Sequence, residues 1–253
     1  MVIEFTGKRA FITGGSRGIG AATVKLFAGA GARVAFTYRS HRAEADAVVK
    51  AAGGSAQCFA IQADLSDPKA GATSVEEAAK RLGGLDYFVA NAGVWPPDDE
   101  PVRDMDPERW RKTMAVNLDA VFYGCRAALP LIAPGGAIVI VTSTAGQRGE
   151  AYHADYAATK GALISFVKSI AIEAAPGITV NSVAPGWVDT EMSAVPYDRD
   201  RGAGRQEIAA SIPLQRIATA EDIAGPIAFL CSPLARHITG EILNVNGGAV
   251  LCG

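Results

Sequence analysis

The chain has 253 residues, of which 49% are hydrophobic, and this composition excludes a largely disordered protein. Its 24 basic and 26 acidic side chains give a net charge of −2, so no basic excess indicates nucleic acid as a main partner. No apolar run is long enough to span a membrane, the N-terminus lacks the features of a signal peptide, and the four cysteines form no metal-binding pattern. We therefore expect a cytoplasmic protein without a metal site.

Short apolar runs alternate with Ala-rich segments of helical spacing. The runs are rich in Val, Ile and Phe, as is typical of strands buried on both faces. They predict strands at residues 9–13, 33–38, 57–61, 85–90, 137–142, 179–183 and 242–246. Helices are predicted at residues 19–30, 43–52, 70–82, 107–129 and 154–175. This order predicts an α/β fold, with a single domain over residues 1–253 and a doubly wound Rossmann parallel sheet of about seven strands between two layers of helices.

The first predicted strand is followed at once by a helix, and between them lies the glycine-rich turn Thr13-Gly14-Gly15-Ser16-Arg17-Gly18-Ile19-Gly20. Glycines allow the backbone to approach a phosphate, and the N-terminus of the helix offers amide donors to it. A position between a strand and a helix is the context that a dinucleotide-binding turn requires.

The same turn contains the G-x-S-x-G pattern of serine hydrolases around Ser16, with His237 downstream. A nucleophile after the first strand would have no earlier strand and loop to supply an oxyanion hole, and Gly20 would have no role. We therefore favour the dinucleotide interpretation.

The end of the second strand indicates which dinucleotide binds. An acidic residue there would bind the ribose 2′-hydroxyl of NAD, but this chain has Tyr38-Arg39-Ser40. Arg39 and Arg17 could face a 2′-phosphate, whose geometry suits guanidinium, or could be solvated surface groups. We favour NADP(H). Asp64, after the third strand, could accept a hydrogen bond from the adenine amino group or cap the following helix.

Tyr156 and Lys160 lie four residues apart in a predicted helix and therefore share one face, with Ser143 upstream. A nearby ammonium favours phenolate and lowers the pKa of a phenol, and a serine hydroxyl could hold a substrate oxygen. Such a site transfers a proton to or from an alcohol or carbonyl if another group supplies the hydride. Tyr and Lys at this spacing also form ordinary helix faces, so the pair alone does not decide the function.

The segment at about 187–212 breaks the alternation of strands and helices. Its composition predicts a mobile substrate loop with short helical pieces, or else a simple surface excursion. The residues behind this prediction are Pro196, the charged cluster Asp198, Arg199, Asp200 and Arg201, and the glycines Gly202 and Gly204.

With these pieces in place the chain resembles the short-chain dehydrogenase/reductase family over essentially its whole length. Within that family it is most similar to the 3-oxoacyl-acyl-carrier-protein reductases and their close relatives. Two positions depart from the pattern: Ala90 stands where a second Asn is common, and Asn246 replaces the usual Asp. The matching positions, in family order, are the turn at 13–20, Asp64, Asn91-Ala92-Gly93, Asn117, Ser143, Tyr156 with Lys160, Pro185-Gly186, Thr190 and Asn246-Gly247-Gly248.

The resemblance implies a role for each catalytic position. Tyr156 would be the acid in reduction and the base in oxidation, and Lys160 would lower its pKa and bind the nicotinamide ribose. Ser143 would hydrogen-bond the substrate oxygen. Asn117 would shape its helix and hold a water that links Lys160 to solvent.

The turn, the second strand and the resemblance together give a set of cofactor-binding candidates. They are Gly14, Ser16, Arg17, Gly18, Ile19, Gly20, Tyr38, Arg39, Ser40, Asp64, Leu65, Asn91, Ala92, Gly93, Tyr156, Lys160, Pro185, Gly186, Val188 and Thr190.

We therefore predict an NADP(H)-dependent oxidoreductase that transfers a hydride between the nicotinamide and a carbonyl or secondary alcohol, with ketone or 3-oxoacyl thioester reduction favoured. An NAD-dependent alcohol dehydrogenase of the same family and a non-catalytic NADP(H)-binding sensor remain open. Family resemblance also suggests a homotetramer formed through the helices at 107–129 and 154–175. His153, just before the second of these, is expected at the surface, with a proton-relay role as the alternative. Apolar candidates for the substrate pocket are Val94, Trp95, Trp187 and Met192.

Overall fold

A computed structural model describes residues 3–198 and 203–251. Arg199, Asp200, Arg201 and Gly202 of the predicted substrate loop lie outside these ranges. The strands form one parallel sheet of seven in the order β3-β2-β1-β4-β5-β6-β7, which confirms the predicted architecture. Their bounds are β1 (Arg9–Ile12), β2 (Arg33–Tyr38), β3 (Cys58–Gln62), β4 (Leu85–Ala90), β5 (Ile132–Val141), β6 (Ile178–Pro185) and β7 (Ile242–Val245).

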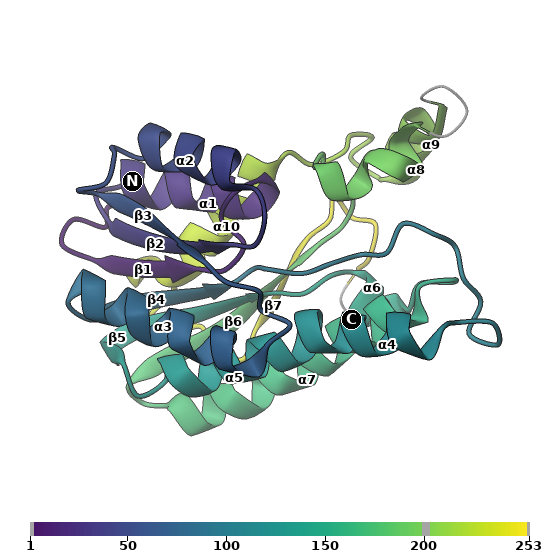
Figure 1. Cartoon of the computed structure of the whole chain (residues 1–253). Helices are drawn as coiled ribbons and strands as arrows, with labels where there is room; N and C mark the ends of the chain where they lie inside the picture. The colour runs from purple at the N-terminus through teal and green to yellow at the C-terminus, as the bar shows by residue number, and fades with distance from the viewer. Residues whose placement is uncertain (1–2, 199–202, 252–253) are drawn as a thin grey trace.

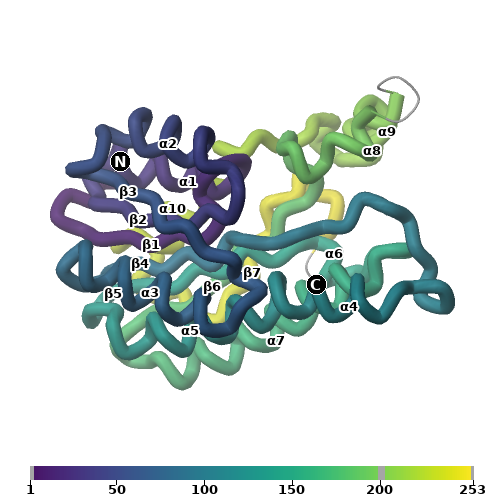
Figure 2. The backbone as a smooth tube through the Cα atoms, in the orientation of Figure 1, coloured from purple at the N-terminus to yellow at the C-terminus, as the bar shows by residue number. Residues whose placement is uncertain are grey.

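Helices cover both faces of the sheet, as Figures 1 and 2 show. One face carries α1 (Gly18–Gly29), α2 (Arg42–Ala51) and α10 (Ala220–Cys231). The other carries α3 (Pro68–Leu82), α5 (Ala120–Ala128) and α7 (Ala154–Ala174), with α4 (Pro107–Met114) beside α7. The remaining α-helices of the described ranges are α6 (Ala145–Arg148), α8 (Ala194–Asp198) and α9 (Ala203–Ser211).

The strands are apolar on both sides because each side faces its own hydrophobic core. In β5, Ile138 and Ile140 pack toward α3, α5 and α7, whereas Val139 and Val141 pack toward α1, α2 and α10. All four side chains are almost completely buried. The absence of strict polar alternation in the sequence follows from this two-sided burial.

The direction of strand order reverses between β1 and β4. In an open parallel sheet, a crevice opens at the carboxyl ends of the strands on either side of such a reversal, and ligands bind there. The glycine-rich turn leaves β1 at this crevice, and Asn91 leaves β4 beside it.

Two features of the helices differ from the sequence expectation. The predicted helix at 107–129 is interrupted by a π-helical turn, Ala115–Asp119, which separates α4 from α5. Helix α10 was not predicted, because Pro226 and Gly225 in its middle obscure the helical pattern. Thr219 and Asp222 nevertheless form a capping box at its start, a sequence signal that could have located it.

The predicted substrate loop contains a 3₁₀ turn, Glu191–Ser193, and two α-helices in its described part, α8 and α9, which stand beyond the carboxyl ends of the sheet (Figure 1). Tyr197 is buried, and its hydroxyl donates a hydrogen bond to the Val188 carbonyl oxygen at 2.9 Å. Arg205 pairs with Asp189, its Nη1 lying 2.9 Å from Oδ1. The segment is thus tied back to the residues that follow β6. None of the helices in the described ranges is long and apolar enough to cross a membrane.

Candidate active site

Helix α1 begins without a side-chain cap. Its N-cap residue, Arg17, makes no capping hydrogen bond, whereas Asp67, Asp106 and Thr219 cap α3, α4 and α10. The first-turn amides of a helix have no partner within the helix, and here Gly18 and the residues after it line a pocket. The first turn also contains no acidic side chain. This end of α1 therefore suits a bound anion such as a phosphate.

Two glycines of the turn allow its close packing. Gly14 has φ +69°, and a Cβ atom there would lie 3.0 Å from the Ala92 Cα. A Cβ atom at Gly20 would lie 2.1 Å from the Gly14 carbonyl oxygen, closer than any side chain permits. Gly20 thus lets α1 pack directly against the turn, which the dinucleotide fold requires. The residues present fit a dinucleotide pyrophosphate.

Asn91 holds this turn in place from the neighbouring strand. Its Nδ2 donates to the carbonyl oxygens of Thr13 and Gly14 at 3.0 and 3.2 Å, and its backbone N–H donates to Thr13 Oγ1 at 3.0 Å. The Ala92 N–H donates to the same Thr13 oxygen at 3.0 Å. The predicted Asn-Ala-Gly segment therefore joins the ends of β1 and β4 beside the pocket.

The exit of β2 brings cationic and polar side chains to the far end of the pocket. Tyr38, Arg39 and Ser40 line it together with Arg17 from the turn. His41, which sequence reasoning missed, lies between them: its Nε2 is 3.2 Å from Arg17 Nη1 and its Nδ1 is 3.2 Å from Ser40 Oγ. Its place directly after the Tyr-Arg-Ser sequence was the available signal.

Asp64 lines the pocket, and its carboxylate is also used locally. Oδ1 accepts hydrogen bonds from the Ser66 N–H at 3.0 Å and the Ser66 hydroxyl at 2.8 Å, and these bonds hold the pKa of Asp64 below its usual value. The cap of α3 is Asp67 instead. Asp64 thus shapes the turn after β3 while remaining at the pocket, where Leu65 also lies.

Asn117 lies in the π-helical turn and is completely buried. Its Oδ1 accepts from the Val94 N–H at 2.7 Å, and its Nδ2 donates to the Val94 carbonyl oxygen at 2.8 Å. A Cβ atom on Gly93 would lie 3.3 Å from Asn117 Oδ1 and 3.6 Å from Lys160 Nζ, so both side chains lie directly beside Gly93. Asn117 fixes the segment after β4, and π-helical turns are frequent at functional sites.

Ser143, Tyr156 and Lys160 lie on one side of the pocket. Ser143 follows β5, while Tyr156 and Lys160 occupy successive turns of α7. Lys160 is 4% exposed; its Nζ donates to the Val141 carbonyl oxygen at 2.8 Å and lies 5.6 Å from the centre of the Tyr156 ring. Ser143 and Tyr156 share a hydrogen bond. The phenol, the hydroxyl and the ammonium therefore meet at one place.

Burial dominates the electrostatics of this trio. Burial raises the pKa of Tyr156 to about 12, the hydrogen bond with Ser143 opposes this rise, and the charge of Glu150 adds to it. Burial also lowers the pKa of Lys160 to about 8. The net pKa of Tyr156 is raised because loss of water disfavours the phenolate more than the hydrogen bond with Ser143 favours it. The expected lowering by Lys160 concerns one contribution to that pKa and stays a prediction.

A cluster of rings and one carboxylate lies beside Tyr156. Trp95 stacks on His153 with ring centres 4.3 Å apart and meets Trp187 edge-on at 6.3 Å. Trp95 Nε1 donates to Glu150 Oε1 at 3.2 Å. His153 is 3% exposed, so the expectation of a surface histidine is wrong; the loop before α7 folds it under Trp95. Sequence reasoning missed Glu150, which no local motif distinguishes.

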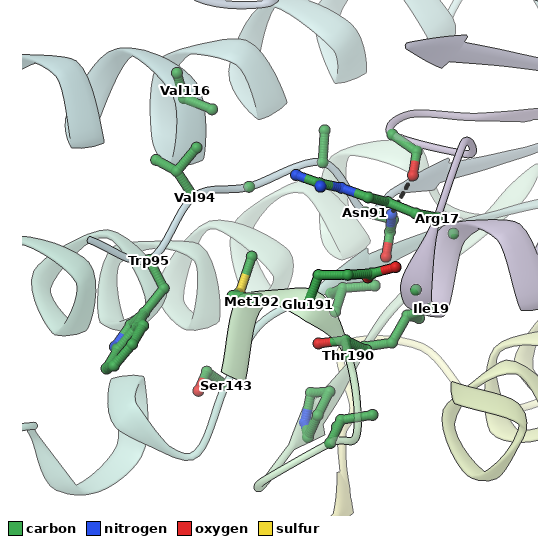
Figure 3. Close-up of a pocket in the computed structure, with 18 of the residues that line it drawn as sticks. Arg17, Ile19, Asn91, Val94, Trp95, Val116, Ser143, Thr190, Glu191 and Met192 are labelled. Atoms are coloured by element: carbon green, nitrogen blue, oxygen red, sulfur yellow. Dashed lines mark hydrogen bonds between the residues drawn. The ribbon is translucent and has the colours of Figure 1, made fainter. Parts of the chain in front are cut away.

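Figure 3 shows how the pocket divides. Arg17 and Ile19 lie at one end, Trp95 and Ser143 at the other, and Thr190, Glu191 and Met192 lie between them. All the predicted cofactor-binding residues line this pocket, as do Ser143 and the four apolar substrate candidates. Of the predicted catalytic residues, Asn117 alone is not in its lining.

The hydrolase alternative lacks its histidine. Ser16 lines the main pocket, whereas His237 lies with Leu234 and Ile238 in a separate surface depression. The two side chains therefore do not form a nucleophile and base in the described structure.

Comparison with known proteins agrees with this geometry. Residues 14–250 match the sequence profile of the family described as Enoyl-(Acyl carrier protein) reductase. The 3-oxoacyl-acyl-carrier-protein reductase of Escherichia coli is 37% identical over 249 residues, covering 97% of this chain and 98% of that protein. The chain belongs to the short-chain dehydrogenase/reductase family. It is an oxidoreductase of that family, whose members use a nicotinamide cofactor.

Two solved structures extend the comparison. A Brucella melitensis protein named as a short-chain dehydrogenase/reductase, glucose/ribitol dehydrogenase, superposes with a TM-score of 0.93 at 36% identity, and the match covers 100% of both chains. A short-chain dehydrogenase from Burkholderia cenocepacia, solved in complex with NADP, has a TM-score of 0.89 at 38% identity, covering 97% of this chain and 98% of that one.

Proposed function

We propose that this protein is an NADP(H)-dependent reductase of carbonyl compounds, ketones or 3-oxoacyl thioesters. The observation that carries the proposal is the convergence of Ser143, Tyr156 and Lys160 on the same pocket as the uncapped start of α1. One end of the pocket suits the phosphates of a dinucleotide, and the other holds a proton donor. The E. coli relative, named as a 3-oxoacyl-acyl-carrier-protein reductase, supports the substrate class.

When bound, a reduced nicotinamide supplies a hydride to the carbonyl carbon. The protein manages the charge that then develops on the carbonyl oxygen. Ser143 and Tyr156 both donate hydrogen bonds to that oxygen, and such donors stabilise the transition state most where water is excluded. Tyr156 transfers its phenolic proton to the oxygen, which leaves an alcohol and a tyrosinate.

Lys160 assists this proton transfer electrostatically. Its ammonium, fixed by the Val141 carbonyl oxygen, lies close enough to favour the tyrosinate once it forms. Asn117 holds the chain at Val94, and so keeps the segment next to Lys160 in position. We assign Tyr156 as the acid, Ser143 as the second donor, and Lys160 and Asn117 as the groups that sustain proton transfer.

The choice of NADP(H) over NAD(H) is part of the proposal. Arg17 and Arg39 line the end of the pocket where the 2′-phosphate of NADP(H) would lie. No carboxylate stands at the last residue of β2, Tyr38, or at the two positions after it, Arg39 and Ser40. The B. cenocepacia structure in complex with NADP supports the same choice. Guanidinium groups suit phosphate better than hydroxyl groups.

NADPH oxidation with a panel of ketones and β-ketoacyl thioesters tests the activity directly. Turnover of at least one member, with NADPH preferred to NADH, is the expected result. Tight NADPH binding without turnover on any member would instead support the sensor alternative, and turnover with a preference for NADH would support the NAD-dependent dehydrogenase.

We also propose that the protein assembles as a homotetramer through α5 and α7. On these helices Phe122 is 44% exposed and lies against Phe166, with ring centres 6.4 Å apart, and Ile172 is 80% exposed. Exposed apolar side chains gathered on two neighbouring helices favour helix packing between subunits. Light scattering gives the mass in solution, and a monomer would contradict the proposal.

A further inference from the structure

Glu150 places a carboxylate at the substrate end of the pocket. It belongs to the loop between α6 and α7 and lines the same pocket as Ser143 and Tyr156. Its negative charge helps to raise the pKa of Tyr156. Glu150 is therefore within electrostatic reach of the group that we assign as the proton donor, yet the proposed reduction gives it no task.

Only part of this carboxylate is used inside the protein. Oε1 accepts from Trp95 Nε1 at 3.2 Å, and in the described ranges this is the one hydrogen bond that the Glu150 side chain makes. A carboxylate can accept about four hydrogen bonds. Glu150 is half-buried, and burial raises its pKa although His153, Trp95 and Arg148 oppose that rise. The unused oxygen lone pairs of Glu150 are partly shielded from water, so a ligand that donates a hydrogen bond to them is bound more favourably.

The wall beside Glu150 is aromatic and is held from several sides. His153 covers Trp95 by stacking, Trp187 meets Trp95 edge-on, and Tyr197 packs against Trp187 with ring centres 5.9 Å apart. Because the Trp95 indole is also hydrogen-bonded to Glu150, the wall and the carboxylate keep a fixed relation. Aromatic rings beside a carboxylate favour cations and hydrogen-bond donors, and they disfavour anions.

We propose that Glu150 is a specificity residue that selects carbonyl substrates carrying a hydrogen-bond donor, a protonated amine or a hydroxyl, on the side of the molecule away from the reacting carbonyl. This inference rests on the proposed reductase activity, because Ser143 and Tyr156 must hold the carbonyl for the donor to reach Glu150. A site that hydrogen-bonds its substrate discriminates strongly against analogues that lack the donor, since the buried acceptor is then left without a partner.

Four ring ketones of similar size test the proposal. They are 1-methylpiperidin-4-one with a protonated amine, 4-hydroxycyclohexanone with a hydroxyl, 4-methylcyclohexanone with neither, and 4-oxocyclohexanecarboxylate with a negative charge. We expect kcat/KM of the wild type to favour the first two over the methyl compound by about 10-fold or more, and the carboxylate to be the poorest substrate.

Variants of Glu150 separate the two donor types. Glu150→Gln removes the charge but keeps an acceptor, so the preference for the amine should fall about 10-fold while that for the hydroxyl persists. Glu150→Leu should remove both preferences. Glu108→Gln, which makes the same change on the surface of α4, serves as the matched control and should alter neither ratio. Equal ratios in the wild type and Glu150→Leu, or preference for the carboxylate ketone, would overturn the proposal.

Trp95→Phe tests whether Glu150 acts only by positioning Trp95. The variant removes the indole N–H, and with it the hydrogen bond to Glu150, but keeps an aromatic ring and the negative charge of the carboxylate. Direct recognition predicts that the amine-to-methyl ratio survives in Trp95→Phe, whereas a fall equal to that of Glu150→Gln would overturn direct recognition.

A binding measurement distinguishes failure of this inference from failure of the reductase proposal. Trp95 and Trp187 are two of the chain's three tryptophans and both line the pocket, so a ligand there should change tryptophan fluorescence. Titration of the NADPH-bound protein with 1-methylpiperidin-4-ol, the alcohol product, should show binding weakened about 10-fold in Glu150→Gln. If thioesters are reduced but affinity for the amino alcohol is unchanged by the variant, the inference fails and the reductase stands. If no carbonyl compound is reduced yet the affinity difference remains, the reductase fails and the acceptor site stands.

Discussion

Arg109 forms an ion pair with Asp155, the residue that immediately precedes the proposed proton donor Tyr156 in the sequence. Arg109 Nε donates to Asp155 Oδ2 at 3.1 Å and Nη2 lies 3.4 Å from Oδ1, so the guanidinium holds both carboxylate oxygens. Thr113 adds a third hydrogen bond at 2.8 Å. Asp155 is completely buried and precedes Tyr156 in the first turn of α7. The pair thus links α4 to the start of the helix that carries Tyr156 and Lys160.

We predict that Arg109→Ala destabilises the fold by about 3–5 kcal/mol, because it leaves the buried Asp155 carboxylate without its cation. Replacing both partners, as Arg109→Met with Asp155→Leu, should restore most of the loss. Urea denaturation measures both effects. Arg103→Ala, which breaks an exposed pair with Asp104, should cause no measurable change. A loss no larger than that control would show that the pair does not secure α7.

The same pair predicts acid sensitivity. Burial alone would raise the pKa of Asp155, but the hydrogen bonds from Arg109 and Thr113 prevail and hold it below its usual value of 3.8. A carboxyl with a lowered pKa stabilises the folded state above its unfolded pKa and loses this contribution as pH falls through its folded pKa. Between pH 5 and acid conditions, Asp155→Asn should therefore lose less stability than the wild type, as thermal unfolding across that range would show. A parallel decline in both proteins would contradict this linkage.

Tyr156→Phe should abolish carbonyl reduction while NADPH binding remains nearly intact. The variant removes only the hydroxyl, and with it the proton that the carbonyl oxygen needs. Single-turnover kinetics and NADPH fluorescence titration give the two quantities separately. Residual activity within about tenfold of the wild type would exceed what the loss of a general acid allows and would end the assignment.

Lys160 should limit the activity of the reductase at high pH and lower the stability of the folded protein. Burial lowers its pKa from 10.5 to about 8, so we expect kcat/KM for reduction to decline above about pH 8 as the ammonium is lost. The unfolded chain binds this proton more tightly than the folded one, which makes the charged lysine destabilising below about pH 8.

Lys160→Met should therefore lose activity yet unfold with a free energy higher by an order of 1–3 kcal/mol at neutral pH. The gain should shrink as pH rises from about 8 toward 10.5, where lysine is neutral in both states. Chemical denaturation at pH 7 and pH 10 checks the sign. A variant less stable than the wild type at pH 7 would show that the Val141 hydrogen bond outweighs the burial of the charge.

Arg39→Asp should shift cofactor preference toward NAD(H) by roughly tenfold or more, since a carboxylate repels a 2′-phosphate and accepts from a 2′-hydroxyl. Affinities for NADPH and NADH, measured by nicotinamide fluorescence, give the preference ratio. Arg42→Asp is the matched control, because Arg42 pairs with Asp46 on the surface of α2 and is outside the pocket lining. An unchanged ratio in Arg39→Asp would show that this arginine does not contact the phosphate.

His41 should contribute through Arg17. Because its Nε2 lies 3.2 Å from Arg17 Nη1, His41→Leu releases the guanidinium at the end of the pocket. We expect NADPH affinity to fall several-fold with NADH affinity unchanged, and the effects of His41→Leu and Arg17→Ala to be less than additive. Full additivity in this double-mutant cycle would mean that the two side chains act independently.

Much of the fold could be predicted because its signals are local. Apolar runs located all seven strands, and β2 and β4 have the predicted bounds. The other strand ends agree within two residues, except that β5 begins at Ile132, five residues before the predicted start. The helices with regular periodicity were also found. Two predictions failed where tertiary packing overrides the local pattern. One is the π-helical turn that contains Asn117, whose side-chain amide is hydrogen-bonded to the Val94 backbone. The other is α10, which forms although Pro226 lies inside it.

The sequence by itself determined the chemistry available to this protein. Two local features specify their own geometry without help from distant residues. They are the glycine-rich turn between a strand and a helix, and the tyrosine and lysine at helical spacing. Only the tertiary structure decided which distant residues meet. Glu150, His153 and Trp95 come together from two loops, and His41 meets Arg17 where the chain leaves the adjacent strands β1 and β2. It also decided the sign of the Tyr156 pKa shift, because desolvation depends on everything packed around the phenol and not on the lysine four residues away.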